Sequence, residues 1–375
     1  MICFSKVRRY LPATLSLLLG AFVITSVPAN AYDHAGLARE ALEHHIRPGY
    51  TAFDTSAAGL SSAVAALCAA PSIDELARAR AAFKDAALSW ARIEHLRFGP
   101  IADEQRHDRL LFWPDPKGVV RKQVAAVIES ADETAFDNRL ATKSVALQGF
   151  SALDVVLYGP GSETLETAGA KDTPLCRYAT SLSANIASIA KATSAAWSAD
   201  SAYEKLWLQP GDGNTVYLSP KETTQALLQA YALGVEQVRD QRLTGQLGLQ
   251  KVGTKAMEPM LPNSGLALAF LQANIEGLRG LLSEGGFIAH QTEPPTTDLN
   301  AQVMTVLGSI KDELSRAIDA AASAAKMSAT PFKDDAAREK LISMGFPLKN
   351  AYQTGGQTIA EQANITMGFN ALDGD

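Results

Sequence analysis

The chain is poor in residues that mark several common classes of protein. It has 3 Cys in 375 residues, aromatic residues make up 7% of it, and its 6 His form no H-E-x-x-H motif. It also lacks any block of basic residues, and its 34 Lys and Arg are outnumbered by 40 Asp and Glu. Nucleic acid is therefore not an expected partner, and a zinc site built on that histidine motif is excluded.

Long runs of β-branched residues are also missing, whereas Ala is abundant and apolar residues recur at spacings of three and four. This periodicity is typical of helices, so we predict an all-α fold. At this length two domains are expected, each a helical bundle resembling a four-helix bundle. We place them at residues 32–205 and 206–375, because the Gly-rich, polar segment 207–214 is typical of a connection.

Residues 1–31 have the features of a secretory signal peptide. Three basic residues precede an apolar run from Leu11 to Val27, and Ala29-Asn30-Ala31 supplies a cleavage site. Cleavage would leave 31 Lys and Arg against 40 Asp and Glu, a net charge of −9. We predict a soluble, exported, periplasmic protein that is not an integral membrane protein after cleavage.

Two cysteines, Cys68 and Cys176, remain after the predicted cleavage. An even pair in an oxidising compartment most simply forms a disulfide, and two buried free thiols are the alternative. A disulfide would join two points about 100 residues apart within the N-terminal half.

A capping box at Ser72 to Glu75 predicts a long helix that continues to Phe98, with Ile73, Trp90 and Ile93 on its buried face. Glu94 and Arg97 occupy positions where this apolar face should continue. A buried charge is costly unless it is paired, so this end of the helix is either exposed or borders a polar cleft.

The central segment of the chain is Leu147 to Gly159. Apolar residues follow one side of the predicted helix, while Ser151, Asp154 and Tyr158 share the neighbouring face at i, i+3 and i+7. Such a group either lines the seam of a bundle or binds a ligand. Arg97 and Asp115 are expected to converge on this face, together with the Glu94 carboxylate. Trp113, in the Pro-rich aromatic segment beside Asp115, either covers the end of the bundle or joins this site.

The segment resembles the signature of imelysin-like proteins, G-x-H-x-x-E, with Gly149 in place, Ser151 at the histidine and Asp154 at the glutamate. Weaker similarities are Arg97 to Pro100, Trp113 to Asp115, a helix carrying Asn274, and the final eight residues. The resemblance implies two helical bundles with the motif helix near their interface, Asn274 facing the first domain, and the family branch associated with iron uptake.

Two functions follow. In the first, the protein is non-enzymatic and binds iron or another divalent cation, or assists periplasmic or membrane iron-uptake components. In the second, it is a metal-dependent peptidase of the imelysin type. Asp115 and Asp154 are the expected metal ligands. The expected ligand-binding residues are Glu94, Arg97, Trp113, Asp115, Ser151, Asp154, Tyr158 and Asn274.

Overall fold

The computed structural model describes residues 32–366 except 137, 252, 254 and 289–297. The predicted signal peptide and the final eight residues lie outside this described part. Every regular element within it is helical, which confirms the all-α prediction. The described residues belong to one compact unit, and the boundary at residues 205 and 206 stays a prediction.

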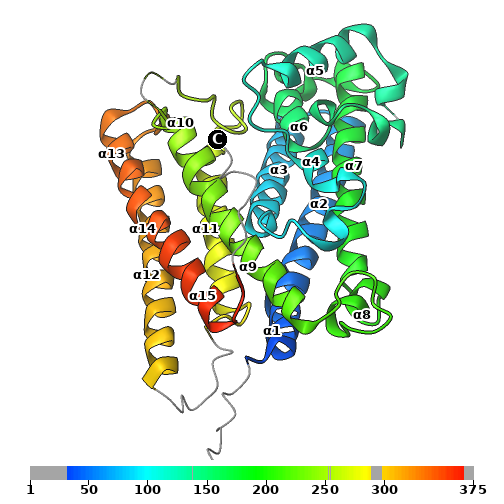
Figure 1. The fold of residues 1–375 in the computed structure, drawn as a ribbon. Coiled ribbons are helices and arrows are strands. Elements are labelled where there is room, and N and C mark those ends of the chain that lie inside the picture. The colour runs from blue at the N-terminus through cyan, green and yellow to red at the C-terminus, as the bar shows by residue number, and fades with distance from the viewer. Residues whose placement is uncertain (1–31, 137, 252, 254, 289–297, 367–375) are drawn as a thin grey trace, which may run out of the picture. The chain divides into compact units, whose positions relative to one another are not determined.

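The N-terminal helices pack as a bundle (Figure 1). Helix α2 lies against both α3 and α7, and α6 packs on α7. One face of α2, including Phe53 and Leu60, is fully buried. The helices of this part are α1 (His34–Ala41), η1 (Leu42–Ile46), α2 (Arg47–Ala69), α3 (Ile73–Ile93), α4 (Arg106–Leu110), α5 (Val119–Ser130), α6 (Gly149–Tyr158), α7 (Pro174–Ala196) and α8 (Ala202–Leu208).

Short 3-10 turns connect these helices. They are η2 (Gly99–Ile101), η3 (Asp103–Gln105), η4 (Glu133–Ala135), η5 (Asn138–Thr142), η6 (Val145–Leu147), η7 (Ser162–Glu166) and η8 (Ala168–Ala170). The predicted disulfide is confirmed: Cys68 near the end of α2 is bonded to Cys176 in the first turn of α7. It fixes two of the long helices of the bundle at the same end.

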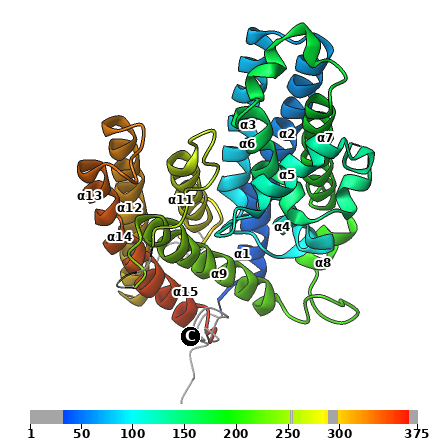
Figure 2. The same ribbon diagram turned by 90° about the horizontal axis from the view of Figure 1, so that it is seen from above.

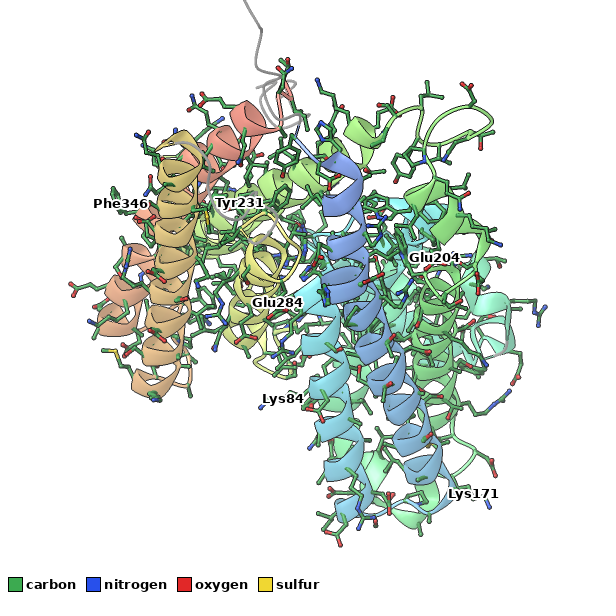
Figure 3. All side chains as sticks on the ribbon, turned by 90° about the horizontal axis from the view of Figure 1, so that it is seen from below. Lys84, Lys171, Glu204, Tyr231, Glu284 and Phe346 are labelled. Atoms are coloured by element: carbon green, nitrogen blue, oxygen red, sulfur yellow. A yellow bond between two sulfur atoms is a disulfide. The ribbon has the colours of Figure 1, made fainter. Side chains whose placement is uncertain are left out.

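The C-terminal helices form a second group (Figure 2). Helix α11 packs on α12, and α9 lies against α1, α11 and α15. The helices are α9 (Pro220–Glu236), η9 (Gln237–Leu243), α10 (Thr244–Leu247), α11 (Ala267–Ser283), α12 (Asp298–Met327), α13 (Asp335–Ser343), α14 (Gly345–Asn350), η10 (Ala351–Gly355) and α15 (Gly356–Gln362). In Figure 3, Tyr231 of α9 lies within this group, and Phe346 of α14 lies at its outer edge.

The two groups meet where α11 crosses α3. Gly277 makes this close approach possible, because a Cβ atom there would lie 1.8 Å from the carbonyl oxygen of Arg92. Gly234 of α9 has a similar place, since its Cβ would lie 2.8 Å from the Cβ of His95. Glycines therefore let the helices of the second group lie directly on the end of α3.

The structure corrects two expectations for the first helices. Helix α3 ends at Ile93 instead of Phe98, and Ile73, expected on the buried face, is 70% exposed because it is the first helical residue. Ser72 caps the helix as predicted, accepting from the Glu75 N–H at 3.2 Å. By length and composition alone, the segment from His34 to Ala69 could cross a membrane. In this structure it packs in the first bundle.

Candidate functional site

The motif helix α6 begins at a point of very close packing. Gly149 has a φ of +67°, which favours glycine. A Cβ atom there would lie 2.2 Å from the carbonyl oxygen of Leu110. The end of α4 therefore lies directly over the start of α6, and only glycine fits between them.

Ser151 holds the segment after α4 in place. Its hydroxyl accepts from the Phe112 N–H at 3.2 Å and donates to the Phe112 carbonyl at 3.0 Å. Three residues further on, the Asp115 carboxylate caps α5, accepting from the N–H groups of Val119 at 2.8 Å and Val120 at 2.9 Å. Ser151 thus fixes the start of a loop, residues 111–118, and Asp115 fixes its end.

Asp154 holds a second loop, which comes from the C-terminal half of the chain. The side chain is fully buried. Its carboxylate accepts from Asn263 through the backbone N–H at 3.0 Å and the side-chain amide at 2.8 Å, and from the Ser264 N–H at 2.9 Å. Burial raises the pKa of Asp154, and these donors act in the opposite direction. Asp154 therefore anchors the segment 255–266 to the first bundle.

A cleft of about 1120 Å³ lies between these two loops and the turn that joins α12 to α13. Trp113 bridges the loops, because its indole N–H donates to the Glu258 carbonyl at 3.0 Å. The charged side chains of the cleft lining are mostly cationic. Its charged lining residues are Lys117, Arg121, Lys122, Lys255 and Lys333, with Asp115 and Glu258 as the carboxylates.

A separate polar network is buried where α3, η9 and α11 meet. Glu94 pairs with Arg242, and Asn274 bonds to both of them. Burial raises the pKa of Glu94, but the Arg242 guanidinium and the Asn274 amide hold it below its usual value. Arg242 is 2% exposed, and the sequence analysis missed it. It follows Val235 and Val238 at i+7 and i+4, a core position that should have marked it as a partner for Glu94.

The expected site residues therefore fall into four places. Trp113, Asp115, Ser151 and Asp154 build the cleft, while Glu94 and Asn274 belong to the buried network. Arg97 is exposed and lies 3.6 Å from Asp108. Tyr158 donates to the Arg80 carbonyl at 2.8 Å, on another face of the bundle.

The described residues contain no group of three or more His, Cys, Asp or Glu side chains placed to hold a metal ion. The expected convergence of Glu94, Asp115 and Asp154 is thus wrong. The reason is local: the carboxylates of Asp115 and Asp154 accept backbone N–H donors of different loops, and Glu94 accepts Arg242.

Comparison with known proteins agrees with this fold. The model of the peptidase M75 family, described as Imelysin, matches residues 46–372. An imelysin-like protein from Psychrobacter arcticum has a TM-score of 0.68 at 19% identity, over 90% of this chain and 97% of its own. A putative iron-regulated protein A precursor from Parabacteroides distasonis has the same TM-score and coverages at 16% identity. No curated protein matches the chain.

Proposed function

Because the chain belongs to the imelysin family, we propose that it is an exported, periplasmic binding protein that assists iron uptake and catalyses no reaction. Its binding site is the cleft between the loops 111–118 and 255–266. The link to iron comes from one structural relative, which is named as iron-regulated. The link to export comes from the predicted signal peptide and from the disulfide.

One observation carries the binding role: the two polar residues of the motif hold the walls of the cleft. The Ser151 hydroxyl both donates to and accepts from Phe112. Asp154 is fully buried and accepts three hydrogen bonds from Asn263 and Ser264. A general base needs access to the proton that it removes, and Asp154 has none. In this chain the motif residues therefore hold the walls of a ligand site and do not take part in a reaction.

The donor atoms around the cleft do not fit a bare cation. A hard cation takes six or more oxygen ligands, and catalytic zinc takes three protein ligands. The described lining of the cleft offers the carboxylates of Asp115 and Glu258, beside five cationic side chains, and no histidine. Direct coordination by Asp115 and Asp154 would also compete with the N–H groups that they already accept.

The cleft instead suits iron that arrives with its own ligands. Five cationic and two acidic side chains give the lining a net charge of +3, in a mature chain of net charge −9. A positive cleft in a negative protein concentrates anions. Ferric iron bound by a polycarboxylate chelator has its coordination filled and carries negative charge, so we propose this class of ligand.

A thermal melt of the mature protein tests this function. Ferric citrate at about one hundred times its Kd should stabilise the fold by about 2.7 kcal/mol. For 344 residues this raises Tm by about 4 °C, since the entropy of unfolding is about 2.1 cal/mol/K per residue. Chelator-free Zn²⁺, Mn²⁺ and Ca²⁺ should leave Tm unchanged. A rise with a bare ion, or none with ferric citrate, contradicts the proposal.

The charge of the cleft has a matched control. Lys255→Gln with Lys333→Gln removes two cations from the cleft lining and should abolish most of the rise in Tm. Lys84→Gln with Lys171→Gln makes the same change of charge outside the cleft, at exposed positions of the first bundle (Figure 3), and should keep it. An equal loss of the rise in Tm in both variants would mean that the net charge of the protein, and not the charge of the cleft, determines binding.

The family model carries the name of a peptidase, so cleavage must be measured too. Incubation of the mature protein with unfolded casein should give no fragments, with or without added metal. Cleavage that EDTA stops, and that Asp154→Asn removes, would replace the binding role by the metal-dependent peptidase.

A further inference from the structure

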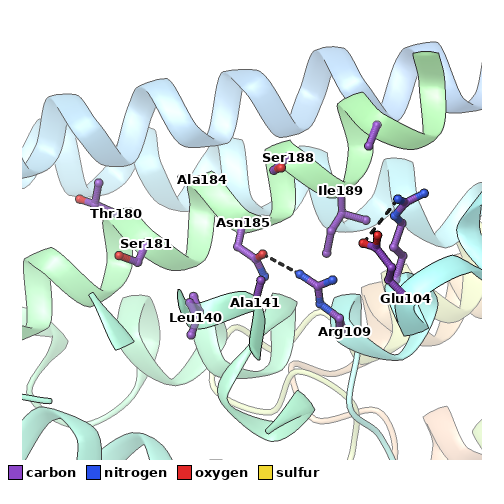
Figure 4. Close-up of a pocket in the computed structure, with 12 residues that line it drawn as sticks. Glu104, Arg109, Leu140, Ala141, Thr180, Ser181, Ala184, Asn185, Ser188 and Ile189 are labelled. Atoms are coloured by element: carbon purple, nitrogen blue, oxygen red, sulfur yellow. Dashed lines mark hydrogen bonds and ion pairs between the residues drawn. The ribbon is translucent and has the colours of Figure 1, made fainter. Parts of the chain in front are cut away.

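A second pocket, of about 520 Å³, lies on the first bundle between α7 and the segment that carries α4 (Figure 4). It shares no lining residue with the cleft. Arg109 from α4 lies at its wall, and Ser181, Asn185 and Ser188 line it from α7. At i, i+4 and i+7 these three residues share one face of the helix.

Arg109 is a buried cation without a counter-ion. It is 9% exposed, and the described residues give it no ion pair. Its Nε donates to the Gln148 side-chain oxygen at 2.9 Å, and its Nη2 donates to the Asn185 side-chain oxygen at 3.0 Å. Both acceptors are neutral amides. Burying a cation without a carboxylate is costly, so this arrangement favours an incoming anion.

The guanidinium also keeps donors free. It has five N–H groups in a planar fork, and two of them are used by Gln148 and Asn185. The other three have no acceptor among the described residues. Asn185 donates to Gln148 at 3.1 Å, which closes the ring of contacts and fixes the plane of the guanidinium. Figure 4 shows the bond between Arg109 and Asn185.

Two acidic residues earlier in this segment pair with another cation, Arg106. Glu104 lies 3.5 Å from Arg106, and Asp103 lies 3.8 Å from the same side chain. Both carboxylates are largely exposed. Arg106 is therefore paired with two acids. Glu104 also lines the pocket, but its charge acts on Arg109 only from beyond ion-pair distance.

Hydroxyl groups complete the donor set. Ser181 and Ser188 line the pocket, and neither hydroxyl has a hydrogen-bond partner in the described part of the chain. A guanidinium fork together with hydroxyl groups recognises the oxygens of a carboxylate or a phosphate. The volume of the pocket holds a small molecule that carries one such group.

From these contacts we propose that the pocket binds a small oxyanion, a carboxylate or phosphate group, through the free N–H groups of Arg109 and the hydroxyls of Ser181 and Ser188. This site is independent of the proposed function of the cleft. It would give the protein a second ligand of the same sign of charge at a separate place.

Isothermal titration of the full mature protein with inorganic phosphate, and separately with acetate, at low ionic strength tests the site. Saturable binding of one anion per chain is expected. Phosphate alone would identify a phosphate ligand, acetate alone a carboxylate ligand, and both the shared oxyanion chemistry. No saturable binding of either anion overturns the proposal.

Variants locate the binding. Ser181→Ala with Ser188→Ala removes two unpartnered hydroxyls without loss of a protein contact, so the fold is kept and affinity should fall by about tenfold. Arg109→Lys keeps the charge but loses the fork and should weaken binding at least as much. Ser323→Ala, exposed on α12, is the control. Unchanged affinity in the double serine variant, or in a folded Arg109→Lys protein, contradicts the assignment.

Discussion

Asp154→Asn isolates the role that we assign to the motif helix. The carboxylate accepts two hydrogen bonds from Asn263 on one oxygen and one from Ser264 on the other. An amide has a single oxygen, so its best orientation keeps the Asn263 pair and turns an NH₂ group toward the Ser264 N–H. One hydrogen bond to a charged group is lost, which costs about 1.5–3 kcal/mol.

The cost of burying the charge disappears in the same substitution, which offsets part of this loss. We therefore expect a net destabilisation of about 2 kcal/mol, and a fall in Tm of about 3 °C for a chain of this length. The larger effect should be local, because Ser264 loses its anchor and only the Asn263 contacts still hold the segment 255–266 to α6.

Hydrogen exchange read by mass spectrometry follows both loops. Asp154→Asn should speed exchange in peptides covering 255–266 and leave 111–118 protected. Ser151→Ala should do the reverse, because Ser151 bonds to Phe112. Unchanged exchange at 255–266 in a folded Asp154→Asn protein would refute the reasoning, since Asp154 would then not hold the loop.

Three further predictions concern the fold. Gly277→Ala should push α11 away from α3 and lower the free energy of unfolding by about 1–3 kcal/mol, as urea denaturation measures. Gly308→Ala on α12 is the control, because its Cβ meets open space, and it should raise the free energy of unfolding by about 0.5–1 kcal/mol. Burial lowers the pKa of His45 to about 4, so between about pH 6.5 and pH 4 this imidazole is protonated in the unfolded chain and neutral in the folded one. The free energy of unfolding should therefore fall by about 3 kcal/mol as the pH falls from 6.5 to 4. A His45→Gln protein whose stability has the same pH dependence would contradict this. Cys68→Ser with Cys176→Ser should lower stability by about 2–5 kcal/mol, and an unchanged Tm would mean that the disulfide does not stabilise the fold.

Local signals in the sequence predicted local structure well. The cap at Ser72, the helical face shared by Ser151 and Asp154, and the pair Cys68 and Cys176 were all correct. The first two depend on residues within a few turns of one another. The disulfide could be predicted because only two cysteines remain after the predicted cleavage. A proline inside a helix is a weaker local signal, because the helical segment that begins at His34 continues through Pro48. The π-helical turn at Leu42–Ile46 changes the hydrogen-bond pattern of the helix directly before Pro48. The helix can therefore include this proline, which has no backbone N–H to donate.

Partners that lie far apart in the chain could not be predicted. Asp154 was identified as a site residue, but its partners Asn263 and Ser264 are about 110 residues away and have no spacing that points to it. Arg242 is a different case, since its spacing after Val235 and Val238 marked it as a buried cation that needs a carboxylate, although Glu94 lies 148 residues away. The sequence therefore marked the polar residues of the motif helix, while the cleft depends on loops that only the folded chain brings together.

The position of bound iron tests the central claim most directly. Crystals of the mature protein grown with ferric citrate, measured at the iron absorption edge, give an anomalous difference peak at each iron atom. We expect the peak in the cleft, between residues 114–122 and 255–268, with the chelator oxygens contacting the lysines of its lining. A peak ligated directly by Glu94 or by protein histidines, or a cleft left empty at saturating ferric citrate, would contradict the account.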